Sequence, residues 1–106
     1  MTWKLWLGCL TVATAVVVPG IASANQALAQ KNACLACHAV DKKLVGPAFQ
    51  DIAKKYAGQA DAQAQIAKNI KAGGSGKWGP IPMPAQAALS EADASTLAAW
   101  ILAGSK

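Results

Sequence analysis

Two cysteines and the only histidine of the chain stand close together, as Cys34, Cys37 and His38. Dithiol redox chemistry, zinc binding and covalent attachment of haem all use thiols and imidazole at such spacings. A thioredoxin-like dithiol needs a strand before it and a βαβ frame around it, and the chain has no run of alternating apolar residues to predict one. A structural zinc ion needs four ligands, and this cluster offers three.

The order Cys-x-x-Cys-His favours covalent haem attachment over the other two. The two thiols can add across the vinyl groups of a porphyrin, and positions 34, 37 and 38 of a helix share one side, where the imidazole reaches the iron. Thiol redox chemistry and an incidental pair remain as alternatives. A haem would also fill the core of a small domain that has few aromatic residues.

The candidate sixth ligand of the iron lies in the stretch "GSGKWGPIPMPA". Its glycines and prolines forbid regular structure, and Pro80, Pro82 and Pro84 each fix a φ angle and donate no hydrogen bond. Such a stiff loop can hold one side chain in place, and Met83 stands in its middle. A lone methionine is usually core filler, but one in a stiff loop downstream of a haem motif is favoured as a ligand.

Residues 1–24 have the layout of a secretory signal peptide that is cleaved after Ala24. Lys4 precedes an apolar run over residues 5–18, which is followed by helix breakers and the small-residue triplet Ala22-Ser23-Ala24. An uncleaved membrane anchor is the alternative, because the apolar stretch almost suffices to span a bilayer. Cleavage would leave residues 25–106 as one domain in the periplasm, with no stable membrane anchor.

The charge balance points to a protein partner. The formal net charge is +5, carried by lysine without any arginine. Nucleic-acid binders usually add arginine for bidentate contacts with phosphates and bases, so we expect no nucleic acid. A basic face for an acidic redox protein is favoured, although a lysine surface that only keeps the protein soluble explains the charge equally well.

The elements that must position these residues are helices, so the predicted fold class is all-α. A first helix is expected over residues 25–40. Phe49, Ile52 and Tyr56 mark a second helix that ends before Gly58, and a third helix runs from residue 62 to the glycines at 73 and 74. Ser90, with Asp93 three residues later, predicts the N-cap of a last helix whose buried face includes Leu97, Trp100 and Ile101.

Four stretches together resemble the small bacterial class I cytochromes c of the cytochrome c-551/c-552 (c8) type. They are "CLACH", "VGPAF", "KWGPIPMPA" and the tryptophan of "LAAWIL", and the resemblance covers essentially all of residues 25–106. The resemblance implies the class I cytochrome c fold, in which four helices wrap around one covalently attached haem.

The resemblance also implies roles for six residues. Thioethers would form at Cys34 and Cys37, and the iron would be ligated by His38 and Met83. The carbonyl of Pro47 would accept a hydrogen bond from the other nitrogen of His38, which fixes the tautomer and the ring plane. Trp78 would donate its indole N–H to a haem propionate, with a plain core tryptophan as the alternative.

Two positions depart from the pattern of that family. Gln86 stands where an asparagine often bonds to the methionine sulfur, and Asn69 stands where a basic residue is common near the inner propionate. Without a positive charge there, the ionised propionate favours oxidised iron. We therefore expect a modestly lower reduction potential and a weaker pH dependence than in relatives with the basic residue.

With both axial positions filled by the protein, the expected function is single-electron transfer and not catalysis. A haem protein with a labile methionine, acting as a gas sensor or peroxidase, is the alternative, and a haem-free copper-handling protein is a further one. Compatible partners of a monomeric carrier are a nitrite reductase, a terminal oxidase, a peroxidase or a cytochrome bc1 complex. The resemblance implies a docking surface made of an apolar patch, and lysines near it in sequence are expected to form its rim. The patch is Leu35, Leu44, Val45, Ile81 and Pro82, and the rim is Lys31, Lys42, Lys43 and Lys77.

Overall fold

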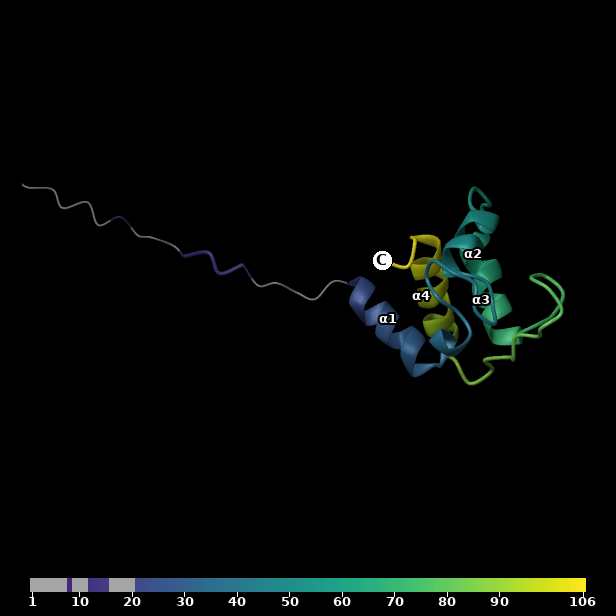
Figure 1. Cartoon of the computed structure of the whole chain (residues 1–106). Helices are drawn as coiled ribbons and strands as arrows, with labels where there is room; N and C mark the ends of the chain where they lie inside the picture. The colour runs from purple at the N-terminus through teal and green to yellow at the C-terminus, as the bar shows by residue number, and fades with distance from the viewer. Residues whose placement is uncertain (1–7, 9–11, 16–20) are drawn as a thin grey trace, which may run out of the picture.

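The computed structural model describes residues 8, 12–15 and 21–106, so the signal peptide predicted over residues 1–24 lies largely outside the described residues. The elements in chain order are α1 (Ile21–Lys31), the 3-10 helix η1 (Cys34–Ala36), α2 (Phe49–Tyr56), α3 (Ala62–Ala72) and α4 (Glu91–Leu102) (Figure 1). Two isolated β-bridges occur, but no strand forms in the described part of the chain. The prediction of an all-α chain with four main helices is confirmed. No helix among the described residues is both long and apolar enough to cross a membrane.

The helix α4 forms the centre of the core. Its N-terminus is capped as predicted, because the Ser90 hydroxyl accepts a hydrogen bond from the Asp93 backbone N–H at 3.0 Å. Leu97, Trp100 and Ile101 are all buried, and all three also line the cavity described below. The expected inward face of this helix is therefore confirmed.

The helix α3 packs along α4. Ile66 and Ile70 bury the face that the sequence pattern predicted. The side-chain amide of Gln63 adds two hydrogen bonds across the helix pair, to the carbonyl oxygen of Ser95 at 3.1 Å and to its hydroxyl at 2.9 Å. The helix ends at Gly73, whose φ of 64° belongs to the left-handed region that favours glycine.

The helix α2 packs against the core through its first and last residues. Phe49 and Tyr56 are buried, and the Phe49 ring meets Trp100 edge-on at a centroid distance of 5.5 Å. The chain turns away shortly after the helix at Gly58, which has a φ of 79°. The second predicted helix is confirmed at the expected place.

The prediction of a first helix over residues 25–40 is wrong in both bounds, because α1 begins at Ile21 and ends at Lys31. The side-chain amide of Asn32 donates to the Leu28 carbonyl at 2.9 Å, and Ala33 takes a left-handed φ of 60°. This residue turns the chain, so Cys34 begins a separate short 3-10 helix. The predicted cleavage point after Ala24 falls in the first turn of α1.

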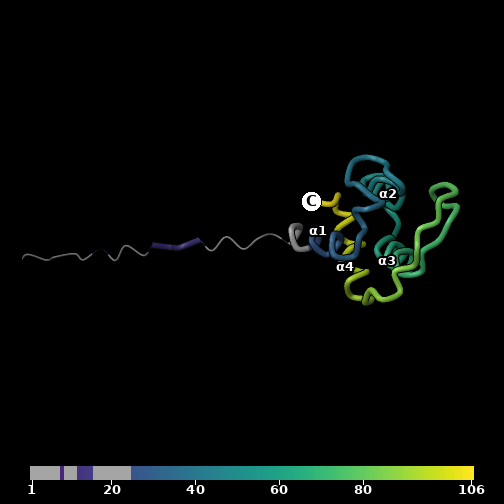
Figure 2. The backbone as a smooth tube through the Cα atoms, turned by 60° about the horizontal axis from the view of Figure 1, so that its bottom comes forward, coloured from purple at the N-terminus to yellow at the C-terminus, as the bar shows by residue number. Residues whose placement is uncertain are grey.

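The segment between α3 and α4 is long and lacks helix. Figure 2 shows its first half as a narrow loop that projects from the helical body and returns beside the end of α3. Gly74 and Met83 form an isolated antiparallel bridge at the base of this loop. Residues of this loop and residues of the turn after α1 line the same cavity, although they are far apart in the sequence.

Candidate functional site

His38 is held by the turn that follows η1. Its backbone N–H donates to the Cys34 carbonyl at 2.9 Å, and the backbone N–H of Gly46 donates to the Cys37 carbonyl at 2.7 Å. These bonds close residues 38–46 into a compact excursion with an antiparallel bridge between His38 and Lys43. The His38 side chain lies at the base of this excursion and is buried.

One hydrogen bond settles which nitrogen of His38 is free. Nδ1 lies 2.7 Å from the carbonyl oxygen of Pro47, and a carbonyl can only accept, so Nδ1 carries the proton and donates it. In the neutral ring, Nε2 then keeps its lone pair, which is the state a metal ligand requires. The contact with Pro47 that the resemblance implied is present in the structure.

Two further contacts fix the plane of the His38 ring. The ring of Phe49 stacks on it, with centroids 5.2 Å apart and an interplanar angle of 18°. On Gly46, an added Cβ would stand 2.6 Å from Cε1 of His38. The imidazole therefore fits because position 46 has no side chain.

Met83 is positioned by its backbone. Its N–H donates to the Gly74 carbonyl at 2.7 Å, and its own carbonyl accepts from the Gly74 N–H at 3.0 Å. Gly73 allows this approach, because a Cβ there would stand 2.5 Å from the Met83 carbonyl oxygen. The side chain of Met83 is half-buried and lines the cavity.

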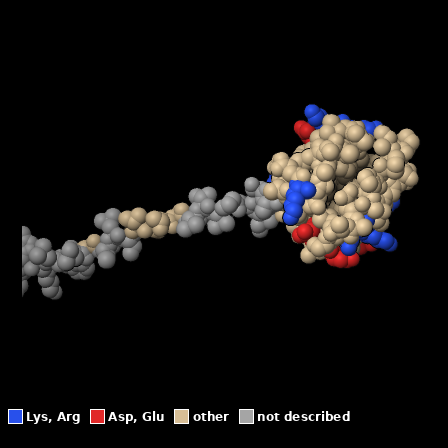
Figure 3. Space-filling view, turned by 90° about the horizontal axis from the view of Figure 1, so that it is seen from below, with Lys and Arg blue, Asp and Glu red and all other residues tan. Residues whose placement is uncertain are grey.

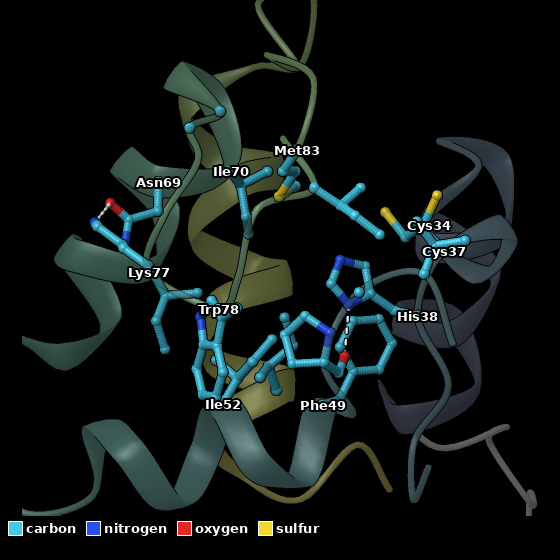
Figure 4. A pocket seen from close by; sticks show the side chains of 18 of the residues that line it. Cys34, Cys37, His38, Phe49, Ile52, Asn69, Ile70, Lys77, Trp78 and Met83 are labelled. Carbon is cyan, nitrogen blue, oxygen red and sulfur yellow. Dashed lines mark hydrogen bonds between the residues drawn. The ribbon is translucent and has the colours of Figure 1, made fainter. Parts of the chain in front are cut away.

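The cavity that collects these residues is open to solvent, and its empty volume is about 1310 Å³ when the solvent-filled space at its mouth is included. Cys34, Cys37, His38 and Met83 all line it, and most of the other lining residues are apolar. Figure 4 shows the two cysteines and the imidazole on one side, with Met83 across from them. Figure 3 looks onto a hollowed face of uncharged residues, with charged side chains toward its edges.

The end of the cavity away from the cysteines is polar (Figure 4). The ammonium of Lys77 donates to Oδ1 of Asn69 at 2.8 Å, and Nδ2 of Asn69 donates to the Tyr56 hydroxyl at 3.1 Å. Trp78 lines the cavity and is 39% exposed, so it is not a plain core tryptophan. The ammonium of Lys55 lies 4.6 Å from the centre of its indole ring.

The donor set fits a haem better than a bare metal ion. Within residues 8, 12–15 and 21–106, no three side chains of histidine, cysteine, aspartate or glutamate gather closely enough to hold a metal. Cys34 and Cys37 are both free thiols. Burial raises the pKa of the Cys34 thiol, and a backbone hydrogen bond partly offsets that. A large apolar cavity, two thiols and an unprotonated imidazole nitrogen match a covalently bound tetrapyrrole.

The structure changes two members of the expected docking surface. Leu44, Val45 and Ile81 are exposed as predicted, at 44%, 50% and 60%. Leu35, in contrast, packs against the core, and Lys77 turns to Asn69 instead of joining a rim. We therefore restrict the apolar patch to Leu44, Val45, Ile81 and Pro82.

Gln86 also differs from its expected surroundings. Its side-chain amide donates to the Pro84 carbonyl at 3.4 Å, and its backbone N–H donates to the Ile70 carbonyl at 3.2 Å. The side-chain amide thus bonds within the loop, and the backbone attaches the loop to α3.

Several residues of the site were not predicted individually. The close contacts at Gly46 and Gly73 depend on packing between segments, although the Gly46-Pro47 pair was a signal that the turn is special. The link from Lys77 through Asn69 to Tyr56 joins three elements and has no signature in local sequence.

Comparisons with known proteins agree with this geometry. The family model described as Cytochrome c matches residues 22–105. Cytochrome c-552 of Nitrosomonas europaea is 54% identical over 97 residues, which cover 92% of this chain and 93% of that protein. Cytochrome c-551 of Pseudomonas aeruginosa is 47% identical over 91% of each chain. The crystal structure of wild-type Nitrosomonas europaea cytochrome c552 superimposes with a TM-score of 0.73 and covers 74% of this chain and 98% of that one.

Proposed function

The chain belongs to the cytochrome c family, and we propose that it carries single electrons between redox proteins of the periplasm through a haem iron ligated by His38 and Met83. It has the class I cytochrome c fold with one covalently attached haem c, and it is an electron carrier and not an enzyme. The observation that best supports the proposed ligands is the shared cavity, to which the His38 turn and the Met83 loop both contribute lining residues.

Cys34 and Cys37 would hold the haem through two thioether bonds. Both thiols line the cavity on the same side as His38 (Figure 4). Covalent attachment keeps the group in the protein in both oxidation states. The axial ligands and the cavity lining would then set the reduction potential of the iron without having to retain the haem.

The haem supplies an iron that takes up and releases one electron. His38 would offer Nε2 to it, and the bond from Nδ1 to Pro47 makes the imidazole a stronger and better oriented ligand. Met83 would offer a soft thioether sulfur, which favours the reduced state and raises the potential. The apolar lining acts in the same direction, because a less polar surrounding disfavours the more highly charged oxidised state.

The partner would meet the cavity mouth. Leu44, Val45 and Ile81 are each exposed, and Lys42 and Lys43 belong to the same 38–46 excursion as Leu44 and Val45. A small apolar contact with lysines beside it suits brief encounters, since charge speeds association and limited area permits release. A nitrite reductase, a terminal oxidase, a peroxidase and a cytochrome bc1 complex are candidate partners. Residues 1–24 would be removed on export.

The alternative is a haem protein that opens its methionine side to a gas or peroxide. The side-chain amide of Gln86 donates to the Pro84 carbonyl in the same loop, so this hydrogen bond does not restrain the Met83 sulfur. That observation favours the alternative. The two backbone bonds between Gly74 and Met83 argue against easy opening. We therefore favour the electron carrier.

The visible spectrum of the exported, haem-loaded protein tests this choice. We expect a sharp low-spin spectrum in the ferrous state that carbon monoxide does not change. A spectrum that shifts on adding the gas would overturn ligation by Met83 and support the gas-binding or peroxidase alternative.

A further inference from the structure

The polar end of the cavity carries a positive charge that the sequence pattern did not predict there. Among the residues that the structure describes, no aspartate or glutamate lines the cavity, and the two lysines that line it are Lys43 and Lys77. Lys43 bridges to His38 by its backbone, on the side of the cysteines. Lys77 lies at the opposite end (Figure 4).

Lys77 is exposed, but its ammonium donates a hydrogen bond to Asn69, whose own side chain is held by Tyr56. Its ammonium is 2.8 Å from Oδ1 of Asn69, and the amide nitrogen of Asn69 is 3.1 Å from the Tyr56 hydroxyl. Tyr56 is buried in the core, so the chain of bonds ends on a rigid group. This arrangement orients the Asn69 amide with its oxygen toward the lysine.

A haem brings two carboxylates into such a cavity, and its remaining surface is apolar. Carboxylates moved out of water require hydrogen bonds or an opposite charge. The Lys77 end offers the ammonium, the Asn69 amide and the indole of Trp78 within one region of an otherwise apolar lining.

We propose that Lys77 is the counter-charge for the haem carboxylates, and that Asn69 and Tyr56 are positioning residues for its ammonium group. The inference rests on the proposed function, because it requires the haem to lie in this cavity with its carboxylates toward Lys77. It also changes the expectation for Asn69: the position lacks a charged side chain, but a lysine from the loop brings a charge to it.

A redox titration of the haem-loaded protein with mediators tests the role of Lys77. Removing a positive charge near the iron favours the oxidised state, so Lys77→Gln should lower the equilibrium constant for reduction about threefold, given partial screening by water. Lys77→Arg keeps the charge and should restore the wild-type value. The control is Lys68→Gln, which makes the same charge change on exposed α3 next to Asn69 but outside the cavity lining. A shift in Lys77→Gln no larger than in this control would overturn the proposal.

The role of Asn69 has its own test in a double-variant cycle. Asn69→Leu should lower the equilibrium constant by a smaller factor than Lys77→Gln, because it frees the lysine without removing its charge. In the Lys77→Gln background the same change should have no effect. A full effect in that background would overturn the positioning role, because Asn69 would then act on the haem without the lysine.

The wild-type titration separates this inference from the proposed function. Suppose that the wild-type protein shows a reversible one-electron couple, and that Lys77→Gln and Lys68→Gln have equal equilibrium constants for reduction. This result would overturn only the proposed role of Lys77. The absence of a reversible couple in the wild-type protein would remove the electron-carrier proposal itself.

Discussion

His38 and Met83 reach one cavity from segments that are fixed in different ways. The imidazole of His38 is buried, is bonded to the Pro47 carbonyl at 2.7 Å and is stacked on Phe49. Met83 is held through its backbone to Gly74, and its side chain is half-buried. A change on the His38 side therefore disturbs packing of the fold, whereas a change on the Met83 side alters chemistry in a fold that persists.

The largest expected effect comes from removing the Met83 side chain. Met83→Ala should keep the haem attached, because neither cysteine is changed, but the equilibrium constant for reduction should fall about a thousandfold when the thioether is lost. A redox titration and ferrous spectra with and without carbon monoxide would measure this. We expect the variant to bind the gas. If its potential and its indifference to the gas matched the wild type, Met83 would not be the ligand.

Adding a methyl group beside His38 should lower the stability of the fold, in contrast to the effect of Met83→Ala on the reduction potential. In Gly46→Ala the new Cβ would stand 2.6 Å from the ring of His38, which the Pro47 and Phe49 contacts hold in place. Forced movement in such packing costs about 3 kcal/mol of unfolding free energy. Denaturant unfolding of the haem-loaded variant would measure it. A loss below about 1 kcal/mol would show that the ring adapts freely, and the contrast between the two sides would weaken.

The matching change on the Met83 side is Gly73→Ala, with Gly58→Ala as its control. Both glycines have positive φ angles, 64° and 79°, which residues with a side chain rarely adopt, so backbone strain should lower the stability of both variants. Only at Gly73 does the new Cβ meet another segment, 2.5 Å from the Met83 carbonyl, while Gly58 faces open space. Gly73→Ala should therefore lose about 1 kcal/mol more and become sensitive to carbon monoxide. Equal unfolding free energies in the two variants would contradict this.

The smallest expected effect concerns the outer edge of the His38 side. Lys42→Glu combined with Lys43→Glu should slow reduction by an acidic redox partner about tenfold at low salt and flatten the salt dependence. Stopped-flow mixing would measure the rate. The control is Lys68→Glu with Lys106→Glu, which makes the same charge change at exposed positions outside the cavity lining. If the two double variants slowed the reaction equally, docking would depend on the net charge of the protein and not on Lys42 and Lys43.

Local sequence predicted the parts of the fold that depend on periodicity and caps. The faces at Ile66, Ile70, Leu97 and Trp100 are buried as expected, and Ser90 caps α4 through Asp93. These features need only neighbours three or four residues apart.

The sequence did not predict features that depend on a single dihedral angle or on distant partners. The first helix was expected to continue through the cysteines, but Ala33 is left-handed, and alanine carries no signal for that. The side chain of Asn69 is uncharged, and local sequence gives no signal that the ammonium of Lys77, from another segment, lies 2.8 Å from it. For the site, residue type and spacing predict Cys34, Cys37, His38 and Met83, and all four line one cavity, but their roles stay predictions. The close approaches of Gly46 to His38 and of Gly73 to Met83 are visible only in the packed structure.

The bridge between Gly74 and Met83 has a consequence for how such a protein can diversify. It clamps the two ends of the loop, so residues 75–82 form a closed insert whose conformation is separated from the position of Met83. Lys77 and Trp78, the cavity residues at the polar end, both belong to this insert. On the proposed role of Lys77, substitutions in this insert would change the reduction potential while the backbone of Met83 stays bonded to Gly74, so selection could modify the insert independently of the iron's proposed ligands.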